Sequence, residues 1–221
     1  MLKWNLIETA QVGRSKFTLL RSGDAWIVQV NRRVLMVNRT FQSEISLAEE
    51  AIARVETPRH VLIGGLGFGY TLRAALDVLP QTARVSVAEL VPELVEWNRR
   101  HLTKLNNAAC DDPRCEIIVG DAFMPIVRAK AAFDAILLDV DNGPEAISHA
   151  KNNRLYNDSG TRACWDALTP GGVLSVWSAG PNDKYTARLK RQGFATEVLR
   201  VPERKGARAT HVLFIGRKPK A

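Results

Sequence analysis

The sequence predicts an α/β fold built on a mostly parallel sheet whose last strand runs antiparallel. Three observations predict it. From residue 60 onward, short apolar runs alternate with segments of helical periodicity, which is typical of β-α-β units. A glycine-rich turn joins the first apolar run to the first helical segment. The last two apolar runs leave no room for a helix between them, so we expect them to form a hairpin.

The first part of the chain differs in character from the rest. Apolar alternation predicts three short strands there, at residues 16–20, 25–30 and 33–37. The pairs Gly23-Asp24 and Asn31-Arg32 between them are typical of turns. We therefore expect two domains, a small N-terminal β segment over residues 1–46 and the α/β domain over residues 47–221.

The α/β domain begins with a helical pattern over residues 46–55, which Thr57-Pro58 ends. Strands are expected at residues 60–64, 84–89, 115–119, 133–139, 172–178, 194–199 and 210–216. Helices are expected at residues 71–79, 91–105, 121–129, 158–168 and 182–191. Sheets of this kind bind ligands at the carboxyl ends of their strands, so the loops after the strands are the places to search for a site.

The turn after the first of these strands holds four glycines, Gly64, Gly65, Gly67 and Gly69. Without a Cβ atom, the backbone can adopt positive φ and approach a ligand closely. The helix that starts near Thr71 would direct free N–H groups toward the same place. This arrangement predicts a cradle for a nucleotide or nucleoside.

Acidic residues follow the next two strands. Glu89 ends the second strand about 20 residues after the turn, where nucleotide-binding folds place a carboxylate on the ribose hydroxyls. Gly120-Asp121-Ala122 follows the third strand, where Asp121 fits a ligand contact and equally fits a helix N-cap.

Two further acids, Asp139 and Asp141, follow the fourth strand. They also fit a simple turn, because Asn142-Gly143-Pro144 comes next. Since all four loops should meet at one edge of the sheet, we interpret both acids as candidate catalytic residues.

Composition restricts the function classes. No run of about 18 apolar residues predicts a membrane span, and no apolar signal core is present at the start of the sequence. The three cysteines lack zinc spacing, so we expect no metal and reduced thiols in a cytoplasmic protein. The net charge is +8, but the basic residues are scattered and carry no nucleic-acid-binding motif, so a nucleic-acid partner is not favoured.

At the four loops the chain resembles the spermidine synthase family of polyamine aminopropyltransferases. The matching segments are Val61-Leu62-Ile63-Gly64-Gly65, Thr71-Leu72-Arg73, Glu89, Asp112-Pro113-Arg114, Gly120-Asp121-Ala122, Phe133 to Asp139, and Leu168 to Leu174. The resemblance covers residues 58 to 178 well and 194 to 216 loosely. It implies a Rossmann-like sheet of the class I methyltransferase superfamily, with a short N-terminal β lead-in.

The resemblance also implies roles. The co-substrate would be S-adenosylmethionine or its decarboxylated form, with the glycines along its tail, Glu89 and Leu90 at its ribose side, and Asp121 and Ala122 at its adenine. Asp139 would accept the proton of an attacking amine, and Asp141 would replace a second family acid. The acceptor would be a small molecule such as a polyamine.

Departures from the family leave the reaction open. Family synthases carry an Asp inside the glycine turn that faces the donor's amine, and this turn, Gly-Gly-Leu-Gly-Phe-Gly, has none. Aminopropyl transfer, methyl transfer to a small molecule or RNA, and a non-catalytic nucleoside-binding protein therefore remain as alternatives. A homodimer through an exposed N-terminal strand edge is also compatible with the sequence.

Overall fold

The computed structural model describes residues 3–140, 143–144 and 153–220 of the chain. These residues form two compact units, Met1–Phe41 and Gln42–Ala221. The division into functional domains at residue 46 stays a prediction. Within the described ranges, no helix is long and apolar enough to cross a membrane.

The first unit is an antiparallel sheet of four strands in sequential order, β1 (Asn5–Val12), β2 (Ser15–Ser22), β3 (Ala25–Val30) and β4 (Arg33–Val37). Its core comes from alternate residues of β2 and β3, such as Leu19 and Val28, which are fully buried. Asn31 and Arg32 both have positive φ, as a tight hairpin turn between β3 and β4 requires. Strand β1, with its exposed and polar residues, was not predicted.

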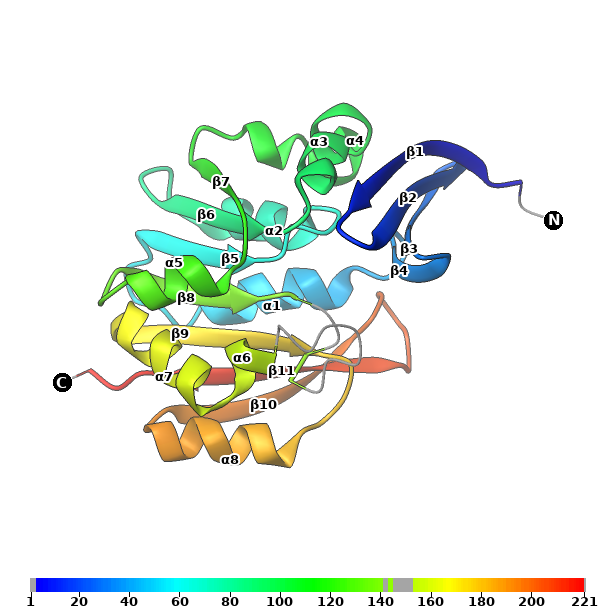
Figure 1. The fold of residues 1–221 in the computed structure, drawn as a ribbon. Coiled ribbons are helices and arrows are strands. Elements are labelled where there is room, and N and C mark those ends of the chain that lie inside the picture. Colours follow the sequence, from blue (N-terminus) through cyan, green and yellow to red (C-terminus); the bar gives the residue numbers. More distant parts are fainter. Residues whose placement is uncertain (1–2, 141–142, 145–152, 221) are drawn as a thin grey trace. The chain divides into compact units, whose positions relative to one another are not determined.

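The second unit is built on a seven-stranded sheet in the order β10-β11-β9-β8-β5-β6-β7 (Figure 1). Its strands are β5 (His60–Gly64), β6 (Arg84–Glu89), β7 (Cys115–Val119), β8 (Phe133–Leu138), β9 (Leu168–Ser178), β10 (Ala195–Pro202) and β11 (Thr210–Arg217). Strands β5 to β9 pair in parallel, whereas β11 is antiparallel to both β9 and β10. The predicted α/β fold and its final hairpin are confirmed.

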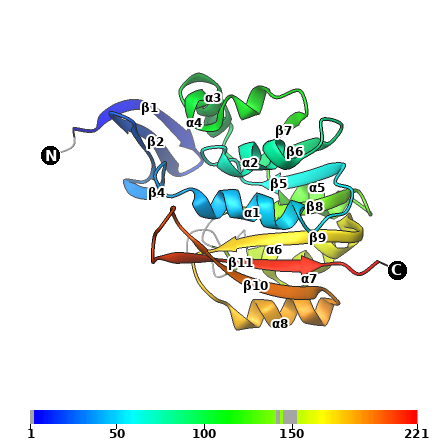
Figure 2. The same cartoon turned by 180° about the vertical axis from the view of Figure 1, so that it is seen from behind.

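Helices cover both faces of this sheet, as the two opposite views show (Figures 1 and 2). One face packs on α1 (Gln42–Ile52) and α2 (Tyr70–Val78), through a core that includes Leu47, Ile63 and Leu137. The other face packs on α5 (Phe123–Arg128), α7 (Asp158–Ala167) and α8 (Asp183–Gln192). Neighbouring residues of one strand serve opposite faces, which accounts for the continuous apolar runs of β5 and β8.

The helices between β6 and β7 differ from the prediction. A single helix was expected over residues 91–105, but the chain forms α3 (Pro92–Arg100), α4 (Thr103–Asn106) and a 3₁₀ turn, η1 (Ala109–Asp111). The break places the Asn106 amide 2.7 Å from the Asn98 side chain, and both then reach the turn after β5. Helix α1 begins four residues before the predicted start at 46, at Gln42, and the short α6 (Asn153–Tyr156) was not predicted.

Candidate functional site

The glycine turn after β5 is tightly packed against its surroundings. Gly65, Gly67 and Gly69 all have positive φ, which L-residues with side chains rarely adopt. A Cβ atom on Gly65 would lie 2.2 Å from the carbonyl oxygen of Asp139, and one on Gly69 would lie 2.6 Å from the Asn106 amide nitrogen. Glycine is therefore required for the turn to reach both the loop after β8 and α4.

Two buried amides, which the sequence did not single out, hold this turn. Asn98 donates from its side chain to the Gly67 carbonyl, and Asn106 donates to the Phe68 carbonyl, each at 2.9 Å. Both asparagines are 1% exposed. Since unpaired carbonyl groups are costly inside a protein, this pair stabilises an irregular backbone segment. In the sequence, both are ordinary polar residues of a helical segment, and no local pattern marks them.

Glu89 lies where the sequence placed it, at the end of β6, and is 6% exposed. Its two carboxylate oxygens accept backbone N–H groups from Leu66 at 2.9 Å and from Val91 at 2.8 Å. Burial raises its pKa, whereas hydrogen bonds from the surrounding backbone lower it. Glu89 thus joins the glycine turn to the start of α3, and Leu90 beside it is exposed.

Asp121 and Ala122 lie after β7, before α5. The Asp121 carboxylate accepts the N–H of Phe123, the first residue of α5, at 2.8 Å, and it also pairs with Arg154. The Arg154 guanidinium lies over the Phe123 ring, 4.7 Å from its centre. Ala122 is buried against Gly64, whose added Cβ atom would lie 3.0 Å from the Ala122 methyl group.

Asp139 lies directly after β8 and faces the start of α2. Its backbone N–H donates to the Gly64 carbonyl at 2.9 Å, and its carboxylate accepts the Thr71 hydroxyl at 2.6 Å. Burial raises the pKa of Asp139 to about 6, against the lowering effect of the Thr71 hydrogen bond. A carboxylate that takes up a proton near neutrality is suited to general-base catalysis.

A second carboxylate, Glu44 of α1, lies near Asp139 and was not predicted. Burial, and after it the charge of Asp139, raise the pKa of Glu44 to about 7. The charge of Glu44 also contributes, after burial, to raising the pKa of Tyr70 to about 12. In sequence, Glu44 is indistinguishable from an ordinary acid in the first turn of a helix.

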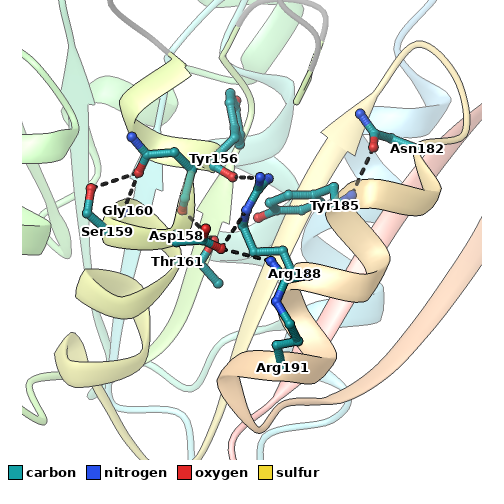
Figure 3. A network of polar contacts seen from close by, with 10 residues as sticks. Tyr156, Asp158, Ser159, Gly160, Thr161, Asn182, Tyr185, Arg188 and Arg191 are labelled. Atoms are coloured by element: carbon teal, nitrogen blue, oxygen red, sulfur yellow. Dashed lines mark hydrogen bonds and ion pairs between the residues drawn. The ribbon is translucent and has the colours of Figure 1, made fainter.

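A polar network links α6 and α7 to α8 (Figure 3). The Tyr156 hydroxyl donates to the Val140 carbonyl at 3.0 Å, and Arg188 donates to the Tyr156 carbonyl at 2.8 Å. Arg188 and Arg191 both contact Asp158 in the first turn of α7. The residue after Asp139 is thereby fixed, whereas the predicted Asp141 lies outside the described residues.

Other features of the described residues do not extend the site. Within the described ranges, no group of three His, Cys, Asp or Glu side chains could hold a metal ion. Burial raises the pKa of the Cys110, Cys115 and Cys164 thiols to about 11, 12 and 12, which disfavours their reactive thiolate forms. A surface pocket of about 360 Å³ lies at the opposite edge of the sheet, around His60 and Asp134, and no predicted site residue lines it.

Comparison with known proteins decides the family. The model of the spermine/spermidine synthase domain matches residues 25–187, which is most of the chain. The chain belongs to the spermine/spermidine synthase family. This confirms the resemblance inferred from the four loops and extends it into the N-terminal strands.

Several curated relatives carry the name polyamine aminopropyltransferase. Polyamine aminopropyltransferase 2 of Pseudomonas aeruginosa is 35% identical over 174 residues, which are 72% of this chain and 48% of that protein. The enzyme of Nitrosomonas europaea is 39% identical over 126 residues, 56% of this chain and 36% of that protein. The chain thus spans about half or less of the length of these relatives.

Solved structures show the same fold. The spermidine synthase of Thermotoga maritima superposes with a TM-score of 0.79 at 20% identity, over 98% of this chain and 73% of that one. A spermidine synthase solved with the transition-state analogue AdoDATO superposes with a TM-score of 0.78 at 21% identity, with the same coverage.

Proposed function

We propose that the chain is an aminopropyltransferase, which moves the aminopropyl group of decarboxylated S-adenosylmethionine to an amine acceptor. The observation that carries the proposal is the pair of carboxylates, Asp139 and Glu44, beside the glycine turn. Both the donor's tail and the acceptor carry ammonium groups, and a partly buried acidic pair attracts such cations locally, against the chain's net charge of +8.

The chemistry requires little from the protein beyond alignment and one proton acceptor. The acceptor nitrogen attacks the donor carbon next to the sulfonium, the C–S bond breaks, and methylthioadenosine leaves as a neutral sulfide. The new C–N bond leaves a proton on the nitrogen, which Asp139 accepts. The Thr71 hydroxyl fixes the orientation of the Asp139 carboxylate for this step.

The other loops would hold the nucleoside. Glu89, at the end of β6, would accept the ribose hydroxyls beside the backbone N–H groups that already hold its carboxylate. Exposed Leu90 can cover one face of the adenine. Asp121 would accept the adenine amino group only by sharing or releasing Arg154.

Methyl transfer from intact S-adenosylmethionine is the second candidate, and one feature favours it. Helix α2 starts after Gly69 without a side-chain cap, so the positive end of its dipole suits the carboxylate of the intact donor. The glycine turn also lacks an acid to hold an ammonium group.

Thermal shifts with four nucleosides separate the candidates, because a ligand that binds only the folded state raises the unfolding midpoint. Aminopropyl transfer predicts larger shifts with decarboxylated S-adenosylmethionine and methylthioadenosine than with S-adenosylmethionine and S-adenosylhomocysteine. The reverse order would replace the proposal with methyl transfer, and no shift with any of them would support a non-catalytic protein. The polyamine acceptor, the homodimer and the cytoplasmic location stay predictions.

A further inference from the structure

Glu44 is the first member of a hydrogen-bonded chain that leads away from the reaction centre. The Ser43 hydroxyl lies 2.8 Å from a Glu44 carboxylate oxygen, and the same hydroxyl oxygen lies 3.0 Å from His211 Nδ1. Ser43 is fully buried, so water does not compete for these two bonds. The three residues come from the start of α1 and from β11, which are far apart in sequence.

His211 is suited to pass a proton to solvent. Its ring is half-buried and packs against Trp177, with ring centres 4.6 Å apart. Burial lowers the pKa of His211, and the charge of Glu203 opposes this effect. The ring is therefore neutral near pH 7 and can accept a proton on one nitrogen while it releases the other to water.

The charged groups around Glu44 are arranged to move a proton outward. The charge of Asp139, at the end of β8, contributes to raising the pKa of Glu44, and the charge of Glu44 contributes to raising the pKa of Tyr70, at the start of α2. Two carboxylates near each other cannot both be ionised without cost, so an incoming ammonium group is stabilised between them and its proton is drawn to the pair. On the other side, Ser43 offers a hydroxyl that both accepts and donates.

We propose that Glu44, Ser43 and His211 form the proton exit of the transfer reaction, with Glu44 sharing the acceptor's ammonium group with Asp139. This inference rests on the proposed amine transfer and adds a route for the proton that the reaction releases.

Each step of this route balances. The proton that Asp139 accepts from the amine nitrogen passes to Glu44, so Asp139 returns to its ionised form. The Glu44 O–H bond then breaks as its proton moves to Ser43 Oγ, while the Ser43 proton moves to His211 Nδ1. The proton on Nε2 passes to water, so Glu44 returns to its ionised form and Ser43 again carries one proton. His211 is left protonated on Nδ1 and regains its Nε2–H tautomer by proton exchange with solvent before the next turnover.

The test compares Ser43→Ala and His211→Ala with Ser86→Ala. Ser86 makes a similar contact with a histidine, 2.9 Å from His60 Nε2 in the middle of β6, so its variant is a matched control outside the site. We expect Ser43→Ala and His211→Ala to lower kcat at saturating donor and amine by about tenfold, below the range for loss of the base itself. Added imidazole should restore the rate of His211→Ala and leave Ser43→Ala unchanged. Rates for both variants within about twofold of Ser86→Ala would overturn the proposal.

A readout without turnover separates this inference from the proposed function. If the wild type transfers nothing, the proposed function fails, and the His211 ring is then followed by NMR as a function of pH. If Glu44, Ser43 and His211 are linked as proposed, the ring signals should respond to ionisation of Glu44 near pH 7. This response should be lost in Ser43→Ala. Identical titration curves of the His211 ring in the wild type and in Ser43→Ala would refute the hydrogen-bonded link between Glu44 and His211, whatever the outcome for the proposed function.

Discussion

Asp139 is the residue on which the proposed chemistry depends most. It combines a raised pKa, a hydroxyl donor at 2.6 Å and a backbone bond to the glycine turn, so its position and its protonation are both controlled. Replacement by asparagine keeps the shape and removes the proton acceptor.

We predict that Asp139→Asn lowers turnover by roughly 100-fold or more, the usual scale for a positioned base, while methylthioadenosine affinity changes by less than about threefold. Steady-state kinetics and calorimetry measure the two quantities. A parallel loss of affinity would instead make Asp139 a donor-binding residue.

Glu44 gives a prediction about stability. Its pKa and that of Asp139 are raised in the folded protein, so their contribution to stability is present at low pH and is lost as the pH rises through about 6 and 7. Glu44→Gln removes one of the two charges and keeps an acceptor for Ser43. The unfolding midpoint of Glu44→Gln minus that of the wild type should be about 2–4 °C higher at about pH 8 than at about pH 5. A difference that does not change with pH would contradict the electrostatic coupling.

At the scale of elements, the turn between β5 and α2 connects fold and site. Its positive φ angles and its close approach to Asp139 and Asn106 leave no room for a side chain at Gly65 or Gly69. The chain offers a matched comparison at Gly206, which has φ +76° and no atom within 4 Å of an added Cβ atom.

We predict that Gly206→Ala lowers the unfolding midpoint by about 2–4 °C, the effect of roughly 1 kcal/mol of backbone strain. Gly69→Ala should lower it by about twice as much, because the new methyl group also displaces Asn106. Scanning calorimetry of both variants measures this, and equal shifts would show that packing on α4 contributes nothing.

Whether a feature lies within one element or between elements decides whether it could be predicted from the sequence. The parallel strands are local apolar runs between turns, so β5, β6 and β7 appear at the predicted residues. Glu44, Asn98 and Asn106 acquire their roles only through contacts between α1, α3, α4 and segments distant in sequence, which no local pattern records. Likewise, the partnership of Asp121 with Arg154 depends on where α6 folds back.

At the scale of the whole molecule, the net charge of the protein and the charge of the proposed site have opposite signs. The chain carries +8 overall, whereas the groups that face the reacting atoms in our account are the carboxylates of Asp139 and Glu44. A local acidic pair within a basic protein binds its cation by short-range contact rather than by long-range attraction. Amine binding should therefore depend less on ionic strength than in a protein with a broad acidic surface.

Product analysis tests the central claim most directly. The protein is incubated with decarboxylated S-adenosylmethionine and a diamine, with intact S-adenosylmethionine in a parallel reaction, and the products are identified by mass spectrometry. Our account predicts equal amounts of methylthioadenosine and aminopropylated diamine in the first reaction and no S-adenosylhomocysteine in the second. Formation of S-adenosylhomocysteine with a methylated acceptor, or no product from the decarboxylated donor with any amine, would contradict it.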